Sequence, residues 1–391
     1  MFPARDMQNH PLRPQRFAPM PKILLSTTVR WPSAARLAGA LAHSGCAVDA
    51  LFPADHPLAA SRYPARRYAY RALGAIKSLR AAIEESRPDL IVACDDRAAG
   101  HLRALHAEAP APVRDRIERS LGNPDAYAAL ASRSGFVTAA REAGIDAPET
   151  VSIEDEATLD FALKIMGLPA VLKADGSWGG DGLAVVHTVQ EAKAAWKRLA
   201  VPPSRLRSLL RAARRGDAHY LKAALKPAKP SVCLQRFVAG APATTSFVCR
   251  DGVVLAANHF AVIATNGAAG PASVVRRIDD ANMEEAARRL ARRFGLSGLH
   301  GLDYVRDAKG KSHLIEINPR ATQTSHLSFG PGHDLCAALV GASAPAGRAI
   351  ANDAVALFPQ EWKRDRASAW LQSAHHDVPW DDPRVIDRCV G

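Results

Sequence analysis

The sequence has few cysteines, few aromatic residues and no long hydrophobic run. Its six cysteines form no CxxC pair, which argues against zinc or disulfides and favours buried free thiols in a reducing compartment. No apolar segment approaches the roughly 18 residues that cross a bilayer. The Pro-rich, basic residues 1–20 lack the apolar core of a secretory signal and are expected to form a disordered tail. We therefore expect a cytoplasmic protein without a transmembrane segment.

Acidic residues are also in deficit, since 51 Lys and Arg face 39 Asp and Glu, for a net charge of +12. The excess is local. Residues 197–230 carry ten basic side chains against one acidic, and residues 1–22 carry four against one, which leaves the remaining chain neutral. Such a distribution does not indicate a nucleic-acid-binding body but one basic insert and one basic tail.

Prolines bound the basic insert, residues 202–230. A helix is predicted over 204–215, because its apolar residues recur at helical spacing on one face: Leu206, Leu209, Leu210 and Ala213. The first interpretation is a solvated helix that covers its own apolar stripe. The second is a subunit contact or an anionic membrane surface. Nucleic acid comes third, because no readout motif is present.

The 391 residues, 48% of them hydrophobic, suit two or three packed subdomains. Strands expected at 22–26, 48–51 and 89–93 alternate with helices, which indicates a parallel α/β domain over residues 21–120. Ligands of such sheets gather beyond the carboxyl ends of the strands. The polar residues that follow these strands are therefore candidate substrate contacts: Arg30, Asp95 and Asp96.

Two strands expected at 168–174 and 183–187 flank a glycine-rich connection, residues 175–182, and form a β-hairpin. The connection lacks GxxxxGK[ST] and opens no helix, which excludes a P-loop and a Rossmann fingerprint. Its backbone N–H groups can still approach phosphates without hindrance from Cβ atoms. Lys173, two residues before the connection, is placed to contact an α- or β-phosphate.

A second hairpin carries the strongest chemical signal. Its strands are expected at 301–306 and 312–317, with a turn at 307–310. Side chains alternate along a strand, so Glu316 and Asn318 face one side, and the turn brings Asp303 beside them. Two carboxylates and an amide suit Mg²⁺, with Mn²⁺ as an alternative. Arg320 adds a cation for a phosphate oxygen.

Taken together, these segments resemble the ATP-grasp superfamily, which includes the carbamoyl-phosphate synthase large subunit, D-alanine–D-alanine ligase and biotin carboxylase. The matching segments occur in order: LPAVLKADGSWGGDGLAVV, CLQRFVAG and GLDYVRDAKGKSHLIEINPR. The resemblance implies a mixed α/β and α+β chain. An N-terminal parallel α/β domain would precede an ATP-grasp domain over 121–340, with a lid at about 160–235. Residues 341–391 would form a C-terminal extension packed on the body.

The resemblance also implies roles for individual residues. Arg133, Lys173 and the glycine-rich loop would bind ATP phosphates, and the hinge strand would line the adenine: Gly176, Ser177, Trp178, Gly179, Gly180, Gly182, Gln235, Arg236, Phe237 and Val238. Asp303, Glu316 and Asn318 would bind Mg²⁺. Lys173, Arg320 and one of Arg276 and Arg277, with Arg276 preferred, would stabilise the transferring phosphoryl group.

Three positions depart from the usual family pattern. Arg133 and Gln235 stand where members usually have lysine and glutamate, and residues 240–245 lack the acidic residue that often binds ribose. His326 follows the metal strand closely and is a further candidate substrate contact. The departures at Arg133, Gln235 and residues 240–245 leave the predicted metal ligands unchanged.

The resemblance predicts an ADP-forming ligase that uses Mg·ATP to join a carboxylate to an amine or a similar nucleophile. Its partners would be small-molecule carboxylate and amine substrates, with a homodimer as one assembly open to this fold, and nucleic acid is not expected. One alternative is a kinase or carboxylase on the same fold. Another is a non-catalytic protein that binds an anionic surface or nucleic acid through residues 197–230.

Overall fold

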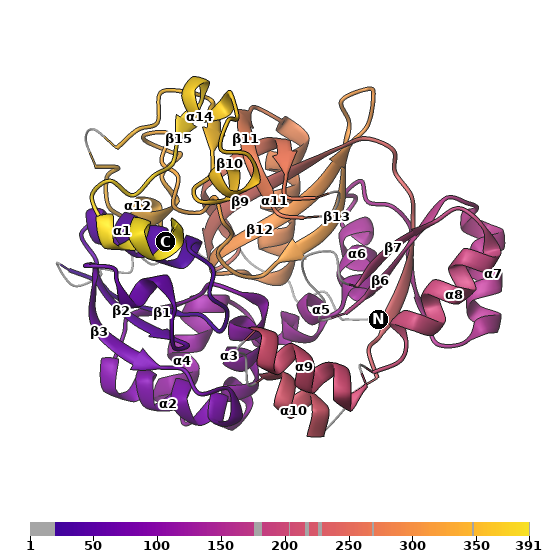
Figure 1. The fold of residues 1–391 in the computed structure, drawn as a ribbon, viewed down its shortest axis with the longest axis horizontal. Helices are drawn as coiled ribbons and strands as arrows, with labels where there is room; N and C mark the ends of the chain where they lie inside the picture. The colour runs from indigo at the N-terminus through magenta and orange to yellow at the C-terminus, as the bar shows by residue number, and fades with distance from the viewer. Residues whose placement is uncertain are drawn as a thin grey trace.

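The computed structural model describes residues 20–175, 182–202, 204–215, 219–225, 229–267, 270–345 and 348–390. Three sheets divide the chain: an N-terminal sheet, a small lid sheet and a large central sheet (Figure 1). Residues 1–19, and residues 176–181 of the predicted phosphate loop, lie outside the described part.

The N-terminal sheet is parallel, in the strand order β3-β2-β1-β4. Its elements are β1 (Lys22–Ser26), α1 (Ser33–His43), β2 (Ala47–Phe52), β3 (Pro64–Ala69), α2 (Ala75–Ser86), β4 (Leu90–Ala93), α3 (Asp96–Glu108) and α4 (Ala111–Leu121). Ile23 and Leu25 pack against α1, while Leu24 points to the opposite core beneath α2, α3 and α4. This sheet is therefore buried on both faces, as a parallel sheet requires.

The lid sheet is antiparallel, in the order β5-β8-β6-β7. Its strands are β5 (Thr150–Ile153), β6 (Ala170–Ala174), β7 (Leu183–Val186) and β8 (Val232–Arg236). Two amphipathic helices, α7 (Glu156–Met166) and α8 (Val189–Leu199), share its hydrophobic core. The expected hairpin around Lys173 is present as β6 and β7.

The basic insert contributes α9 (Arg205–Arg215) and α10 (His219–Leu225), which pack against each other, and α10 also contacts η2 (Ala72–Gly74) of the N-terminal domain. The predicted helix is therefore present, but it does not cover its apolar stripe. Leu206, Leu209 and Leu210 are 68%, 48% and 61% exposed. Among the side chains of α9 that the structure describes, Ser208 and Ala212 are the buried ones, so the interpretation that this helix covers its own apolar stripe is wrong.

The central sheet has the order β13-β12-β9-β10-β11-β14-β15. Its strands are β9 (Ala241–Arg250), β10 (Val253–Thr265), β11 (Ala272–Ile278), β12 (Gly298–Arg306), β13 (Ser312–Asn318), β14 (Ala354–Ala356) and β15 (His375–His376). The dipeptide Asp251-Gly252 predicts a hairpin turn from the sequence, and it forms the turn between β9 and β10, where the two residues have φ values of 48° and 80°. Positive φ at both central residues is typical of a tight hairpin turn.

Helices α6 (Arg133–Glu142) and α11 (Ala281–Phe294) cover one face of the central sheet. The sequence predicts one helical stretch over roughly 124–143, closed by Gly144, but the structure divides it into a 3₁₀ turn, α5 (Tyr127–Ala131) and α6. The break lies at Ser132, whose hydroxyl accepts from the Gly135 N–H at 3.1 Å and caps α6. This break places Arg133 in the first turn of α6.

The C-terminal segment adds α12 (Leu335–Val340), α13 (Gln360–Arg364), α14 (Trp370–Ser373) and α15 (Pro383–Val390). Val385 and Cys389 of α15 share a hydrophobic core with α1, so the chain end packs against the N-terminal domain (Figure 1). All six cysteines are buried free thiols, as expected. Within the described residues, no helix has both the length and the apolarity to cross a bilayer.

Candidate active site

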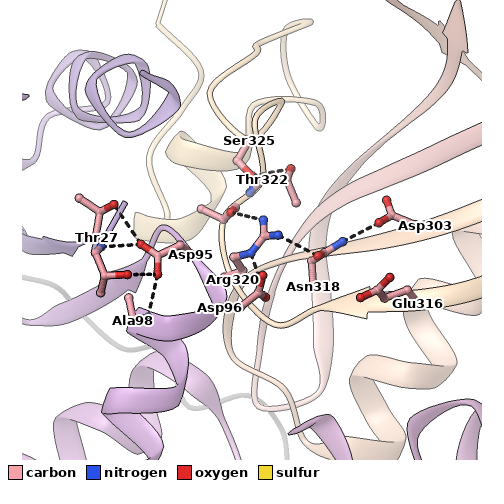
Figure 2. Close-up of polar contacts among 12 residues, drawn as sticks. Thr27, Asp95, Asp96, Ala98, Asp303, Glu316, Asn318, Arg320, Thr322 and Ser325 are labelled. Atoms are coloured by element: carbon pink, nitrogen blue, oxygen red, sulfur yellow. Dashed lines mark hydrogen bonds and ion pairs between the residues drawn. The ribbon is translucent and has the colours of Figure 1, made fainter. Parts of the chain in front are cut away.

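The two predicted carboxylates lie side by side on the β12–β13 hairpin. Asp303 pairs directly with Glu316 across these antiparallel strands, so both side chains share one face. The Asn318 amide donates to Asp303 Oδ2 at 2.8 Å (Figure 2). Burial raises the pKa of the Asp303 carboxyl, and repulsion from Glu316 raises it further. Two acidic groups that repel each other therefore lie next to one another on this face.

Arg320 connects the hairpin to the N-terminal domain. Its Nη2 donates to Asn318 Oδ1 at 2.9 Å, and its Nε forms an ion pair with Asp96 at 3.0 Å (Figure 2). The guanidinium also lies over the Trp31 ring, 5.9 Å from its centre. Burial disfavours the charge of Arg320, but the attraction of Asp96 and Asp303 outweighs it and raises its pKa.

Two cations approach the same acidic face from the other side. Lys173 on β6 is only 5% exposed, and burial lowers its pKa against the opposing attraction of Glu316 and Asp303. Arg133 donates from Nε and Nη2 to Glu316 Oε1 at 3.2 and 3.0 Å, and from Nη1 to the Ala174 carbonyl. Arg133 therefore links the lid sheet to the central sheet.

The hinge strand places its predicted residues in different directions. Gln235 is buried, and its amide donates to Thr150 Oγ1 at 2.9 Å within the lid sheet. Arg236 turns away to the Met166 carbonyl and Glu149, at 2.8 and 3.0 Å. Beyond the end of β8, Phe237 is 36% exposed and Val238 is half-buried. The other two, Phe237 and Val238, have apolar side chains that make no hydrogen bonds.

The predicted glycine loop is described only at its two ends. Gly176, Ser177, Trp178, Gly179 and Gly180 lie outside the described residues. The Gly182 carbonyl accepts from the Ala174 N–H at 2.8 Å, which continues the β6–β7 hairpin. At the other end, Asp175 Oδ1 accepts from the Arg133 N–H at 3.4 Å.

The predicted N-terminal contacts separate into structural and cavity positions. Asp95 is buried and caps α3, accepting from the Ala98 and Thr28 N–H groups at 2.9 and 2.6 Å and from the hydroxyls of Thr27 and Thr28 (Figure 2). Its carboxylate is thereby fully engaged in joining β1 to α3. Arg30 donates from Nε to the Ala54 carbonyl at 2.8 Å and lines a large cavity.

His326 and Arg276 are not brought to the acidic face. His326 is buried in a separate cavity of about 370 Å³, where its Nε2 contacts Asp377 Oδ2 at 2.7 Å. Arg276 is exposed and lies over the Trp370 ring, 5.8 Å from its centre. Arg276 pairs with Ala261 on β10, which places it on the sheet face opposite Asp303.

The neighbouring Arg277 instead shares the face of the carboxylates. Cross-strand pairs run from Glu316 through Asp303, Thr244 and Phe260 to Arg277. Its Nη2 lies 3.2 Å from His333 Nε2. Between these residues and Asn318, three hydroxyl groups form a cluster: Ser246 contacts Thr322 and Thr324 at 2.6 and 2.5 Å. Sequence spacing alone does not reveal this cluster, because Ser246 lies on another strand.

A large cavity adjoins Arg320 through Trp31. Its volume is about 1380 Å³, and it lies where β1, β2 and β3 end. Arg30, Gln323 and Tyr220 of the basic insert are among the residues that line it. The position fits the rule that open α/β sheets bind ligands beyond the carboxyl ends of their strands.

Comparison with known proteins agrees with this architecture. Residues 216–324 match the family model of an ATP-grasp domain. No curated protein matches the chain. Similar solved structures include biotin carboxylase from Campylobacter jejuni in a β-γ-ATP complex, with TM-score 0.59 and 14% identity over 84% of this chain and 72% of that one.

Another similar structure is N5-carboxyaminoimidazole synthetase from Staphylococcus aureus with ADP, with TM-score 0.59 and 15% identity over 83% of this chain and 78% of that one. A third is the biotin carboxylase domain of 2-oxoglutarate carboxylase from Hydrogenobacter thermophilus, a dimer with MgADP and bicarbonate. Its TM-score is 0.59, with 15% identity over 85% of this chain and 71% of that one. The chain therefore has the ATP-grasp fold, and its predicted resemblance to that superfamily is confirmed.

Proposed function

We propose that this protein is an ADP-forming ligase that uses Mg·ATP to activate a carboxylate and joins it to an amine or a similar nucleophile. The observation that supports the proposal is the arrangement of five charged side chains. Asp303 and Glu316 on the central sheet face Lys173 and Arg133, and Arg320 lies at the border with the N-terminal domain. Phosphoryl transfer chiefly needs positioned positive charge, which these groups supply.

The acidic face fits a magnesium ion. The donor set on this face is two carboxylates and an amide, those of Asp303, Glu316 and Asn318. Mg²⁺ commonly binds one or two carboxylates and takes its other ligands from water and substrate phosphates. A bound cation would neutralise the repulsion that raises the Asp303 pKa. Bound there, Mg²⁺ would supply charge neutralisation at the phosphates.

Asn318 would reorganise when the metal binds. Its amide nitrogen donates to Asp303, and its oxygen accepts from Arg320. Metal coordination needs the oxygen on the Asp303 side, so the amide would turn over and release Arg320 Nη2. That N–H would then be available to a phosphate oxygen of the substrate.

The basic residues have distinct roles in this proposal. Lys173 lies at a buried position beside the phosphates, where an ion pair is screened little by solvent. When nucleotide binds, the Arg133 guanidinium releases the Glu316 carboxylate and binds phosphate oxygens instead. Arg320, tied to Asp96, stabilises the acyl phosphate next to the large cavity. Each of these residues holds charge in place, and none has to transfer a proton.

The proposed reaction has two steps. A carboxylate oxygen attacks the γ-phosphorus, ADP leaves, and an acyl phosphate forms. An amine then attacks the acyl carbon, the C–O bond to phosphate breaks, and the amine loses a proton as phosphate departs. Both steps develop negative charge on oxygens that the basic residues surround.

Trapping with hydroxylamine tests this proposal. Hydroxylamine intercepts an acyl phosphate as a stable hydroxamate, so a pool of carboxylates should give hydroxamate and ADP in equal amounts. The double variant Glu316→Gln/Asn318→Ala should lose both products, whereas Glu154→Gln, exposed on the lid, should keep them. ADP that requires bicarbonate would instead indicate a carboxylase, and a stable phosphorylated product a kinase. No ADP with any pool, and salt-sensitive capture of anionic surfaces through residues 197–230, would refute enzymatic activity.

A further inference from the structure

The large cavity has three walls from distant parts of the chain. Residues 28–33 after β1 form one wall, and β3 with η2 and α2 forms the second. The third comes from the C-terminal half, with Gln323, Gln360 and Lys363. Tyr220 on α10 closes it from the basic insert. At about 1380 Å³, the cavity exceeds the usual range for a small-molecule site, so it has room for a multi-ring ligand.

The charge around this cavity is positive. Four basic side chains line it against a single acidic one, Glu85. Glu85 lies 3.8 Å from Arg66, which offsets its charge. In the described part of the chain, Arg71, Lys77 and Lys363 form no ion pair of their own. The nearby insert adds further positive charge, which would raise the local concentration of anions.

Aromatic side chains make up much of the remaining surface. Trp31, Tyr68, Tyr70 and Tyr220 line the cavity. Tyr70 is held flat against His101, with ring centres 5.9 Å apart and an interplanar angle of 26°. Such rings offer apolar faces on which a planar group can stack. In a protein with only 6% aromatic residues, four at one cavity mark a specialised surface.

Two contacts connect this cavity to the phosphate-transfer residues. Arg320 lies over Trp31 on the cavity wall while its Nη2 bonds Asn318. Gln323, three residues further on, accepts from Gln360 Nε2 at 3.2 Å. The Gln360 Oε1 atom is buried and has no hydrogen-bond partner among the described residues, so it can accept from a ligand N–H or O–H.

We propose that the cavity binds the substrate that is joined in the reaction, and that this substrate is an organic anion carrying a planar ring. The inference rests on the proposed function for its place in the reaction, but binding itself requires only the cavity. Stacking on Trp31 and Tyr220 holds the ring, Lys77 and Lys363 attract the anionic group, and Gln360 orients a donor. The basic insert thereby forms part of the substrate site.

Calorimetric binding to the full-length protein without nucleotide tests this assignment. The probes are phenyl phosphate and indole-3-acetate, with phenol and indole-3-ethanol as their neutral counterparts and inorganic phosphate as the ringless anion. Both ring anions should bind more tightly than their neutral counterparts and than inorganic phosphate. A preference between the two anions would separate a phosphate-bearing from a carboxylate-bearing substrate. Equal binding of charged and neutral probes, or no binding by any, would overturn the proposal.

Matched variants locate the site. Lys77→Gln/Lys363→Gln should weaken the ring anions roughly two- to thirtyfold. Lys164→Gln/Lys309→Gln, the same charge change at exposed positions outside the cavity, should leave binding unchanged. Trp31→Leu should weaken the ring anions and spare inorganic phosphate. Equal losses in the two lysine pairs would refute the assignment.

A separate measurement keeps the two proposals distinct. Glu316→Gln/Asn318→Ala should lose stabilisation by a non-hydrolysable ATP analogue with Mg²⁺ and still bind the ring anions. If the wild-type protein binds ring anions but gains no stability from the nucleotide, the ligase function fails and the cavity assignment stands. The reverse result would leave the ATP site and remove the substrate assignment.

Discussion

Replacing Asp303 by Asn should stabilise the protein without nucleotide and abolish its response to Mg·ATP. The Asp303 carboxyl is half-buried and directly opposite Glu316, and both its burial and this repulsion raise its pKa. A like-charge pair directly opposite in a sheet costs up to about 1 kcal/mol. Removing it should raise the melting temperature by roughly 2 °C. The Asn318 amide retains an acceptor at position 303, so no new unpaired group arises.

The pH dependence of this gain has a defined sign. Because the folded-state pKa of Asp303 is raised above 3.8, its contribution to stability is full below that pH and is lost as pH rises through the folded value. The free energy of unfolding of Asp303→Asn should therefore exceed that of wild type at pH 7, and the difference should shrink as pH falls toward 4. Asp353→Asn, at an exposed carboxyl outside the acidic face, should show no such difference.

Binding of nucleotide should reverse the order of stability of wild type and Asp303→Asn. At about a hundred times its dissociation constant, a non-hydrolysable ATP analogue with Mg²⁺ should stabilise wild type by about 2.7 kcal/mol. Asp303→Asn should lose most of this increment, so wild type becomes the more stable protein. Thermal unfolding at pH 4, 5, 6 and 7, with and without Mg²⁺ and analogue, measures both effects. A destabilised Asp303→Asn, or one with the full Mg²⁺-dependent increment, would refute the reasoning.

Three further predictions concern other parts of the structure. Arg133→Ala should lower the free energy of unfolding by roughly 2 kcal/mol in urea titrations, because charged hydrogen bonds to Glu316 and the Ala174 carbonyl are lost; an unchanged midpoint would contradict this bridge. Gly298→Ala should destabilise by more than about 1 kcal/mol, since φ is +89° and a Cβ would lie 2.3 Å from the Ser120 carbonyl oxygen, whereas Gly100→Ala, in open space on α3, should stabilise by up to about 1 kcal/mol. Burial lowers the pKa of His326 below 6.5, so the contribution of this side chain to stability is lost as pH falls through that value. The urea midpoint of wild type should therefore fall between pH 6.5 and 5, and that of His326→Gln should fall less. An equal fall of the midpoint in both proteins would count against this reasoning.

The sequence predicted the segments whose patterns are local. The β12–β13 hairpin, the Lys173 strand and the turn at Asp251 and Gly252 follow from alternation and turn chemistry within a few residues. The strand β3 was missed because PARRYA lacks apolar alternation: it is an edge strand whose arginines face solvent. Its position depends on pairing with β2, which no local pattern encodes.

Side-chain direction was harder to predict than the elements themselves. Arg276 and Arg277 are adjacent in the sequence, and the β10–β11 register, with its irregularities near Val262 and Ala264, decides which of them shares the sheet face of Asp303. His326 follows the metal strand by eight residues, yet the chain turns back and buries it against Asp377 of the C-terminal segment. These outcomes depend on contacts between distant segments, which spacing along the chain does not contain.

The bridge formed by Arg133 has a consequence for how ligands enter. Without nucleotide, this side chain already fastens the lid to the central sheet by way of the Ala174 carbonyl and Glu316. In the proposed reaction, the phosphates of ATP bind the Arg133 guanidinium. The Glu316 carboxylate then loses its ion pair and lies beside the phosphates, which repel it. A cation arriving with the nucleotide would add to the attraction of Lys173 and relieve that repulsion, so metal and ATP should bind with positive cooperativity, each strengthening the binding of the other by the same factor. Nucleotide without metal should bind more weakly, because it would have to break the Arg133 bridge and would be repelled by the Glu316 carboxylate.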